Sequence, residues 1–135
     1  MKKLKTVAVP PTQLINFKKR ADECFQLAEI AYSKRFWLGT CINSIHAGIA
    51  LADCLCISVK GLRYAGANHD EAVELYSSIK WNHEDFDKSV RNFGKLLSVK
   101  HHAEYTGKPI TEKDAELVMK SLQRLKDFIF SCLPK

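Results

Sequence analysis

Residues 35–63, RFWLGTCINSIHAGIALADCLCISVKGLR, decide the fold because they form a nearly unbroken apolar run of helical length. Asn43, His46 and Asp53 interrupt the run, and at about 100° per residue they fall on one narrow face of a helix. Trp, Leu, Ile, Ala and Cys side chains occupy the other faces. Since a helix that is apolar nearly all round is a buried one, the run predicts the central helix of the domain.

The polar face of this helix needs partners, because a buried polar group costs roughly 1–3 kcal/mol when it is unpaired. Asn43, His46 and Asp53 must therefore meet water, a partner chain or polar groups on a neighbouring helix. We predict that they edge a ligand-binding groove and lie at or near a homodimer interface. Lys100 and Tyr105, near the end of a later helix, are predicted to point toward the same face.

The rest of the chain divides into four further helical segments with short connections. Their apolar residues recur at helical spacing, and no alternating strand pattern, internal repeat or low-complexity tract is visible. Five helices joined by short loops predict an all-α fold, an antiparallel up-and-down bundle. The predicted additional helices cover residues 14–32, 69–80, 86–105 and 112–132.

Helix-boundary residues support this division. Gly61 suits the left-handed position that follows a helix, and it comes directly after the central apolar run. Asn68 is a predicted N-cap for the short helix, and Thr111 with Asp114 resembles the capping box that opens the last one.

Length and composition indicate one domain. The chain has 135 residues, 46% of them hydrophobic and 27% charged, as in soluble globular proteins. Residues 1–10 are predicted to be a flexible basic lead that ends in proline, and residues 11–135 a single domain. The polar residues inside the apolar run argue against a membrane span, and the start of the chain is too broken by proline for a secretory signal. A cytoplasmic location is expected.

Cysteine and histidine spacing gives no indication of a metal site. The five cysteines, an odd number, match no zinc pattern and are interpreted as reduced thiols in the core. His101 and His102 are adjacent, so on a helix they diverge by about 100° and cannot both ligate one ion. No phosphate loop, HExxH motif or nucleophile elbow is present, and no cofactor is expected.

The charge balance favours acidic partners. The formal net charge is +6, and Lys88, Arg91, Lys95 and His102 align on one helical ridge opposite the apolar face of their helix. This ridge is either a solvated outer face or a surface that contacts the phosphates of a nucleic acid.

Two stretches resemble the HEPN family of helical domains. NSIHAGIALADCLCISVKGLRYAGANHDEAVELY, residues 43–76, is similar to the family's second-helix signature, with its small and apolar helix, Gly-containing loop and His that opens a short helix. SVKHHAEYTGKPITEKDAE, residues 98–116, is similar to the segment with a basic residue, a Tyr and a capped final helix. The resemblance covers about residues 11–133.

This resemblance implies a five-helix bundle that usually dimerises and belongs to toxin–antitoxin or defence systems, often beside a nucleotidyltransferase partner. Active members resemble metal-independent ribonucleases that use an Arg and a His four to six residues later, before the last helix. There this chain has Lys100 and Tyr105, which cannot fully replace them, with His101 or His102 as displaced candidates.

A second match to that spacing, Arg63 with His69, follows the central helix instead. At this stage we interpret Arg63 as a helix C-terminal cation and His69 as a first-turn residue.

Three functions are compatible with these patterns. The first is a HEPN-like domain, weakly catalytic at most, that binds nucleotide, RNA or a nucleotidyltransferase. The second is a metal-independent RNA-cleaving toxin that uses a displaced histidine. The third is a non-enzymatic helical adaptor whose polar stripe is a dimer seam.

Overall fold

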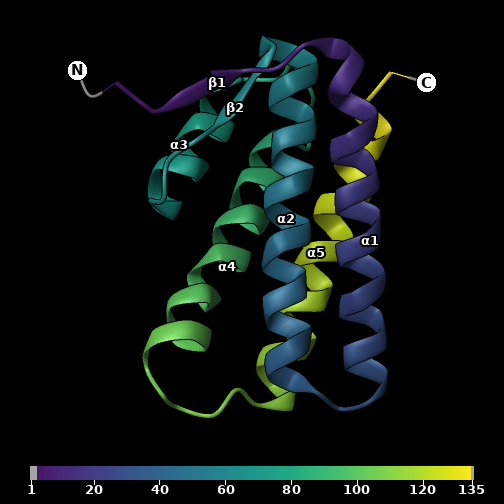
Figure 1. Ribbon diagram of the computed structural model, residues 1–135, viewed down its shortest axis with the longest axis vertical. Helices are drawn as coiled ribbons and strands as arrows, with labels where there is room; N and C mark the ends of the chain where they lie inside the picture. The colour runs from purple at the N-terminus through teal and green to yellow at the C-terminus, as the bar shows by residue number, and fades with distance from the viewer. Residues whose placement is uncertain (1–2, 135) are drawn as a thin grey trace.

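The structure is a computed structural model that describes residues 3–134, apart from the side chains of Lys100, His101, Ala103 and Glu104. Within these residues it confirms the predicted all-α bundle, with five α-helices and one small two-stranded sheet. Four long helices alternate in direction, and the short α3 and the sheet lie at one end (Figure 1). The elements in chain order are β1 (Thr6–Ala8), η1 (Pro11–Gln13), α1 (Leu14–Ser33), α2 (Trp37–Lys60), β2 (Leu62–Tyr64), α3 (His69–Ser78), α4 (Phe86–Tyr105) and α5 (Glu112–Cys132).

Helix α2 is the centre of the bundle, as its apolar sequence predicts. It packs mainly against α1 and α5 and also contacts α4. Gly48 permits the approach to α4, because a Cβ at this position would collide with the Leu96 side chain. By length and composition α2 is the one helix of the described residues able to cross a membrane, but 67% of its most apolar window is buried inside the bundle. This burial is typical of the core helix of a soluble bundle.

The predicted helix-boundary residues are confirmed. Gly61 ends α2 in the left-handed conformation with φ 68°, and its N–H donates to the Ile57 carbonyl at 2.9 Å. The Asn68 side chain accepts from the Glu71 N–H at 3.1 Å and so caps α3. Thr111 and Asp114 form a reciprocal capping box at the start of α5. Local chemistry therefore fixes where three of the helices begin or end.

Residues 6–9 differ from the flexible lead that the sequence predicted for residues 1–10. Thr6–Ala8 form β1, which pairs antiparallel with β2, and Val7 lies opposite Arg63. Val9 follows and is only 5% exposed, and its N–H donates to the Gly61 carbonyl at 2.9 Å. The cause of the difference is that a three-residue strand has no periodicity to read, and its partner lies more than fifty residues away in the sequence.

All five cysteines are free, and Cys41, Cys54 and Cys56 are buried. Burial raises the pKa of Cys41 to about 11 and those of Cys54 and Cys56 to about 12, so these thiols stay protonated at neutral pH. These three therefore act as small core hydrophobes, as the sequence predicts, whereas Cys24 and Cys132 are only partly buried at the edge of the core.

Candidate functional site

A cavity of about 180 Å³ lies between the second half of α2, the β2–α3 connection, α3 and α4. Its lining combines apolar side chains with four polar ones, those of Asp53, Arg63, Tyr64 and His69. The residues around it are Ile49, Ala52, Asp53, Cys56, Arg63, Tyr64, Ala65, Gly66, His69, Ala72, Leu75 and Phe93.

The β2–α3 connection holds the polar residues around this cavity. The Tyr64 hydroxyl accepts from the Asn68 N–H at 3.1 Å, and Asn68 caps α3 directly before His69. Gly66 lies beneath the Tyr64 ring, where a Cβ would collide with the phenol. The turn therefore depends on glycine. It brings Tyr64 and His69, which are five residues apart in the chain, to the same cavity.

Asp53 supplies the buried charge of the site. The residue is 7% exposed, and within the described residues its carboxylate forms no hydrogen bond or ion pair. Since every fully buried side-chain oxygen or nitrogen in these residues has a partner, the carboxylate oxygens must retain some access to the cavity. Burial raises the pKa of Asp53 to about 7, and the nearby Arg63 and Arg20 oppose this rise. Asp53 can therefore hold or release a proton near neutral pH.

Arg63 is the cation of the cavity. Its Nη1 donates to the Tyr64 carbonyl at 3.2 Å, and its guanidinium carbon lies 5.8 Å from the centre of the Phe17 ring. Arg20 packs on the same ring at 4.8 Å. Neither guanidinium forms an ion pair with a carboxylate among the described residues. Arg63 therefore keeps donors with which to contact an anionic ligand.

The predicted polar stripe does not form one groove. Asn43 is half-buried, and its amide donates to the Gly39 carbonyl of its own helix at 2.8 Å, while His46 is exposed. Neither residue lines the cavity that holds Asp53. Ten residues separate Asn43 from Asp53, which is about 15 Å along a helix, so one small ligand cannot contact both.

At the end of α4, His102 and Tyr105 do not line the cavity that holds Asp53. The side chains of Lys100 and His101 are outside the described residues, so their predicted positions stay predictions. The His102 Nδ1 lies 3.2 Å from the Thr106 hydroxyl, near the start of α5. Tyr105 is 70% exposed, so the expectation that it points toward the central helix is wrong. Among the described side chains of α4, Leu97 is the last buried one. Beyond it, the sequence pattern no longer defines an inner side.

Arg63 and His69 line the Asp53 cavity, a position that the sequence did not predict. Their spacing was visible in the sequence, but their place after the central helix led us to interpret them as helix-end residues. The structure puts both around the cavity that Asp53 also lines, because the chain turns back at Gly61 and again before α3. The spacing of Arg63 and His69 was therefore the available signal in the sequence. That the chain returns to α2 after Gly61 could not be predicted from it.

Three of the four residues of the predicted basic ridge line one cavity, and His102 is not among its lining residues. Lys88, Arg91 and Lys95 line one cavity between α4 and α5, and Arg124 of α5 joins them there.

No protein family, curated protein or solved structure was found to match this chain. Its function is therefore inferred from the geometry of its own residues.

Proposed function

We propose that this chain is a HEPN-like domain that binds RNA at the Asp53 cavity and cleaves it without a metal ion. The observation that carries the proposal is that one cavity collects Asp53, Arg63 and His69. Arg63 and His69 have the spacing of the Arg and His pair in the family that the sequence resembles. This proposal replaces Lys100 and Tyr105 by Arg63 and His69 as the residues of the reaction.

Each of the three side chains has a chemical role in such a reaction. The Arg63 guanidinium binds two phosphate oxygens in a planar, two-pronged contact. His69 accepts the proton of the ribose 2′-hydroxyl, because histidine exchanges protons near neutral pH. The 2′-oxygen attacks phosphorus, the bond from phosphorus to the 5′-oxygen breaks, and the leaving oxygen needs a proton. Asp53 supplies it, since its pKa of about 7 keeps a large fraction protonated.

The size of the cavity fits this assignment. A volume of about 180 Å³ is below the roughly 300–1,000 Å³ of sites that enclose a whole drug-sized ligand. It is sufficient for one phosphate and part of its ribose. The flanking nucleotides must therefore lie on the protein surface.

The test is the cleavage of a labelled, unstructured 20-nucleotide RNA in the presence of EDTA. We expect His69→Asn to lower the rate about 10²–10⁴-fold, the usual contribution of a proton-transfer group. Arg63→Gln should lower it about 10²–10³-fold, the usual cost of removing a donor to the charge that develops in the transition state. Arg35→Gln is the charge-matched control, because Arg35 is an exposed residue that pairs with Glu112 at 3.8 Å, and it should leave the rate unchanged. Cleavage that is lost in His102→Asn but kept in His69→Asn would instead favour the displaced histidine.

The partners implied by the resemblance, a second copy of the chain and a nucleotidyltransferase, also remain proposals. His46 is exposed on α2. The face of α2 that carries it can therefore form the predicted homodimer contact. A toxin–antitoxin or defence role follows from the same resemblance and is tested by the growth effect of expressing the wild type against His69→Asn.

A further inference from the structure

A second candidate binding surface lies between α4 and α5, and it shares no lining residue with the Asp53 cavity. A cavity of about 460 Å³ there is lined by Lys88, Arg91, Asn92, Lys95 and Arg124. Four cations and one carboxamide face it, and none of these described residues is a carboxylate. Like charges at this spacing destabilise a helix, so the arrangement favours an anion bound among them.

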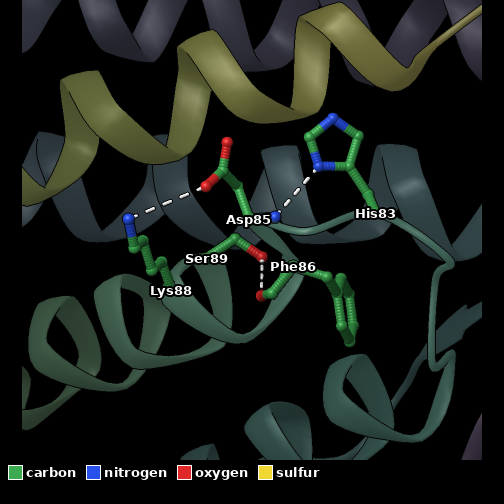
Figure 2. Close-up of polar contacts among 5 residues, drawn as sticks. All are labelled: His83, Asp85, Phe86, Lys88 and Ser89. Carbon is green, nitrogen blue, oxygen red and sulfur yellow. Dashed lines mark hydrogen bonds and ion pairs between the residues drawn. The ribbon is translucent and has the colours of Figure 1, made fainter.

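The groove continues toward the start of α4. An adjoining cavity, also about 460 Å³, shares Lys88, Asn92 and Arg124 with the first and adds His83 and Phe128. The His83 ring stands edge-on to the Phe128 ring, with centroids 5.0 Å apart and an interplanar angle of 88°. Figure 2 shows His83, Asp85 and Lys88 directed toward α5, which runs above them.

The polar contacts in this second cavity fix the His83 ring and divide the groove by charge. The Asp85 N–H donates to the His83 Nδ1 at 3.0 Å, which holds the imidazole in place (Figure 2). Asp85 also lies 3.8 Å from the Lys88 ammonium, and Asp127 accepts from Gln123 at 2.9 Å. Both carboxylates lie at the aromatic end of the groove, so the end near Lys95 is the cationic one.

We propose that the α4–α5 groove binds the backbone of a single-stranded nucleic acid, with phosphates at Arg91, Lys95 and Arg124 and a base against His83 and Phe128. The combination of a positive groove with aromatic side chains is typical of proteins that bind single strands. Lys88 and Lys95 are seven residues apart, about 10 Å along the helix, which matches roughly three stacked nucleotides. An acidic peptide would use the cations but not the aromatic end. The groove goes beyond the proposed function, because it binds whether or not the Asp53 cavity cleaves.

The test is fluorescence anisotropy of a labelled dT12 oligonucleotide between 50 and 200 mM NaCl. The double variant Arg91→Gln with Arg124→Gln should bind at least tenfold more weakly. The slope of log K against log salt should fall by about 1.4, since each contact to a single strand contributes roughly 0.7. Both arginines are exposed, so their replacement leaves the core intact. The matched control, Lys19→Gln with Lys113→Gln, removes the same charge elsewhere on the surface and should stay within twofold of wild type.

Two further probes decide the chemistry of the occupant. An abasic 12-mer should bind at least fivefold more weakly than dT12, because it keeps the phosphates and loses stacking. A 12-residue polyglutamate should bind more weakly still. If the control variant loses as much affinity for dT12 as the double arginine variant, the binding reflects general charge attraction. If polyglutamate binds as tightly as dT12, the partner is an acidic peptide. Either result overturns the proposal.

The dT12 probe also separates this proposal from the proposed cleavage. DNA lacks the 2′-hydroxyl that the reaction needs, so dT12 reports binding alone. Failure of dT12 to bind overturns the groove and leaves RNA cleavage in the Asp53 cavity standing. If RNA is not cleaved but dT12 still binds, the proposed cleavage is overturned and the groove proposal stands.

Discussion

Asp53 and Arg63 line one cavity, and the charge of Arg63 acts on the Asp53 carboxyl, yet the two side chains form no ion pair. The Arg63 guanidinium lowers the pKa of the Asp53 carboxyl, but burial of the carboxyl dominates and raises it to about 7. A direct ion pair would have kept Asp53 ionised and engaged the donors of Arg63. Because the two side chains are not paired, Asp53 can exchange a proton and Arg63 can bind an anionic group such as a phosphate.

The raised pKa of Asp53 predicts a specific dependence of stability on pH. The folded state binds this proton more tightly than the unfolded state, so the stabilisation is complete below about pH 4 and is lost as the pH rises through about 7. A tenfold change in proton affinity corresponds to about 1.4 kcal/mol, so the ionised form costs up to about 4 kcal/mol.

Replacing the carboxyl removes this cost. Asp53→Asn should raise the free energy of unfolding at pH 8 by one to a few kcal/mol, on the order of the ionisation cost. Its advantage over wild type should shrink as the pH falls from about 7 to 4. Urea unfolding at pH 4, 6 and 8 measures this, with Asp87→Asn, an exposed acid on α4, as the control. An advantage that grows toward low pH would contradict the assignment.

The opposing effect of Arg63 can be measured on Asp53 itself. Arg63→Gln removes a nearby positive charge, so the pKa of Asp53 should rise further. Replacement of Arg20, the second cation that acts on this carboxyl, should have the same direction and a smaller size. The measurement is an NMR titration of the Asp53 side-chain carboxyl carbon. A pKa that stays constant or falls in Arg63→Gln would show that Arg63 does not act on the site.

Gly66→Ala should disturb the site without touching its charged groups. The added Cβ meets the Tyr64 phenol, whose hydroxyl accepts from the Asn68 N–H at the start of α3. Overpacking of this kind costs about 1–3 kcal/mol and would displace Tyr64. We expect lower thermal stability and slower RNA cleavage. Gly94→Ala is the control, because nothing lies within 4 Å of its Cβ, and alanine should stabilise α4 by up to about 1 kcal/mol.

A homodimer through the face of α2 that carries His46 is predicted by the polar residues of this helix and by the sequence resemblance. Sedimentation at micromolar concentration should give a dimer, and His46→Glu should shift it toward monomer, because a two-fold interface places like charges opposite each other. Ser58→Glu, at an exposed position further along α2, should leave the dimer intact. A wild-type monomer would remove the dimer from the proposal.

The sequence was sufficient for features that local chemistry determines. The apolar run identified α2, and Gly61, Asn68 and Thr111 marked helix ends, because left-handed backbone and capping bonds involve only neighbouring residues. The Asp53 cavity required long-range information. Asp53 is ten residues before Arg63, and only the turn at Gly61 and the pairing of β2 with β1 bring the chain back to α2.

The pairing of β1 with β2 gives a final prediction, because β2 carries Arg63. In an antiparallel ladder, hydrogen-bonded pairs alternate with pairs that are not hydrogen-bonded. Ala65 donates to Lys5 at 2.9 Å and Val9 donates to Gly61 at 2.9 Å, so the pair of Val7 and Arg63 between them is a hydrogen-bonded one.

Proline at Val7 therefore removes a donor to the strand that positions Arg63, whereas proline at Thr6 removes an N–H that points away from it. Val7→Pro should lower the free energy of unfolding by about 1 kcal/mol more than Thr6→Pro, the usual net value of one hydrogen bond. It should also slow RNA cleavage more than Thr6→Pro does. Urea unfolding and the cleavage assay measure the two effects. Equal cleavage by both variants and the wild type would show that the N-terminal strand holds the fold but does not position the site.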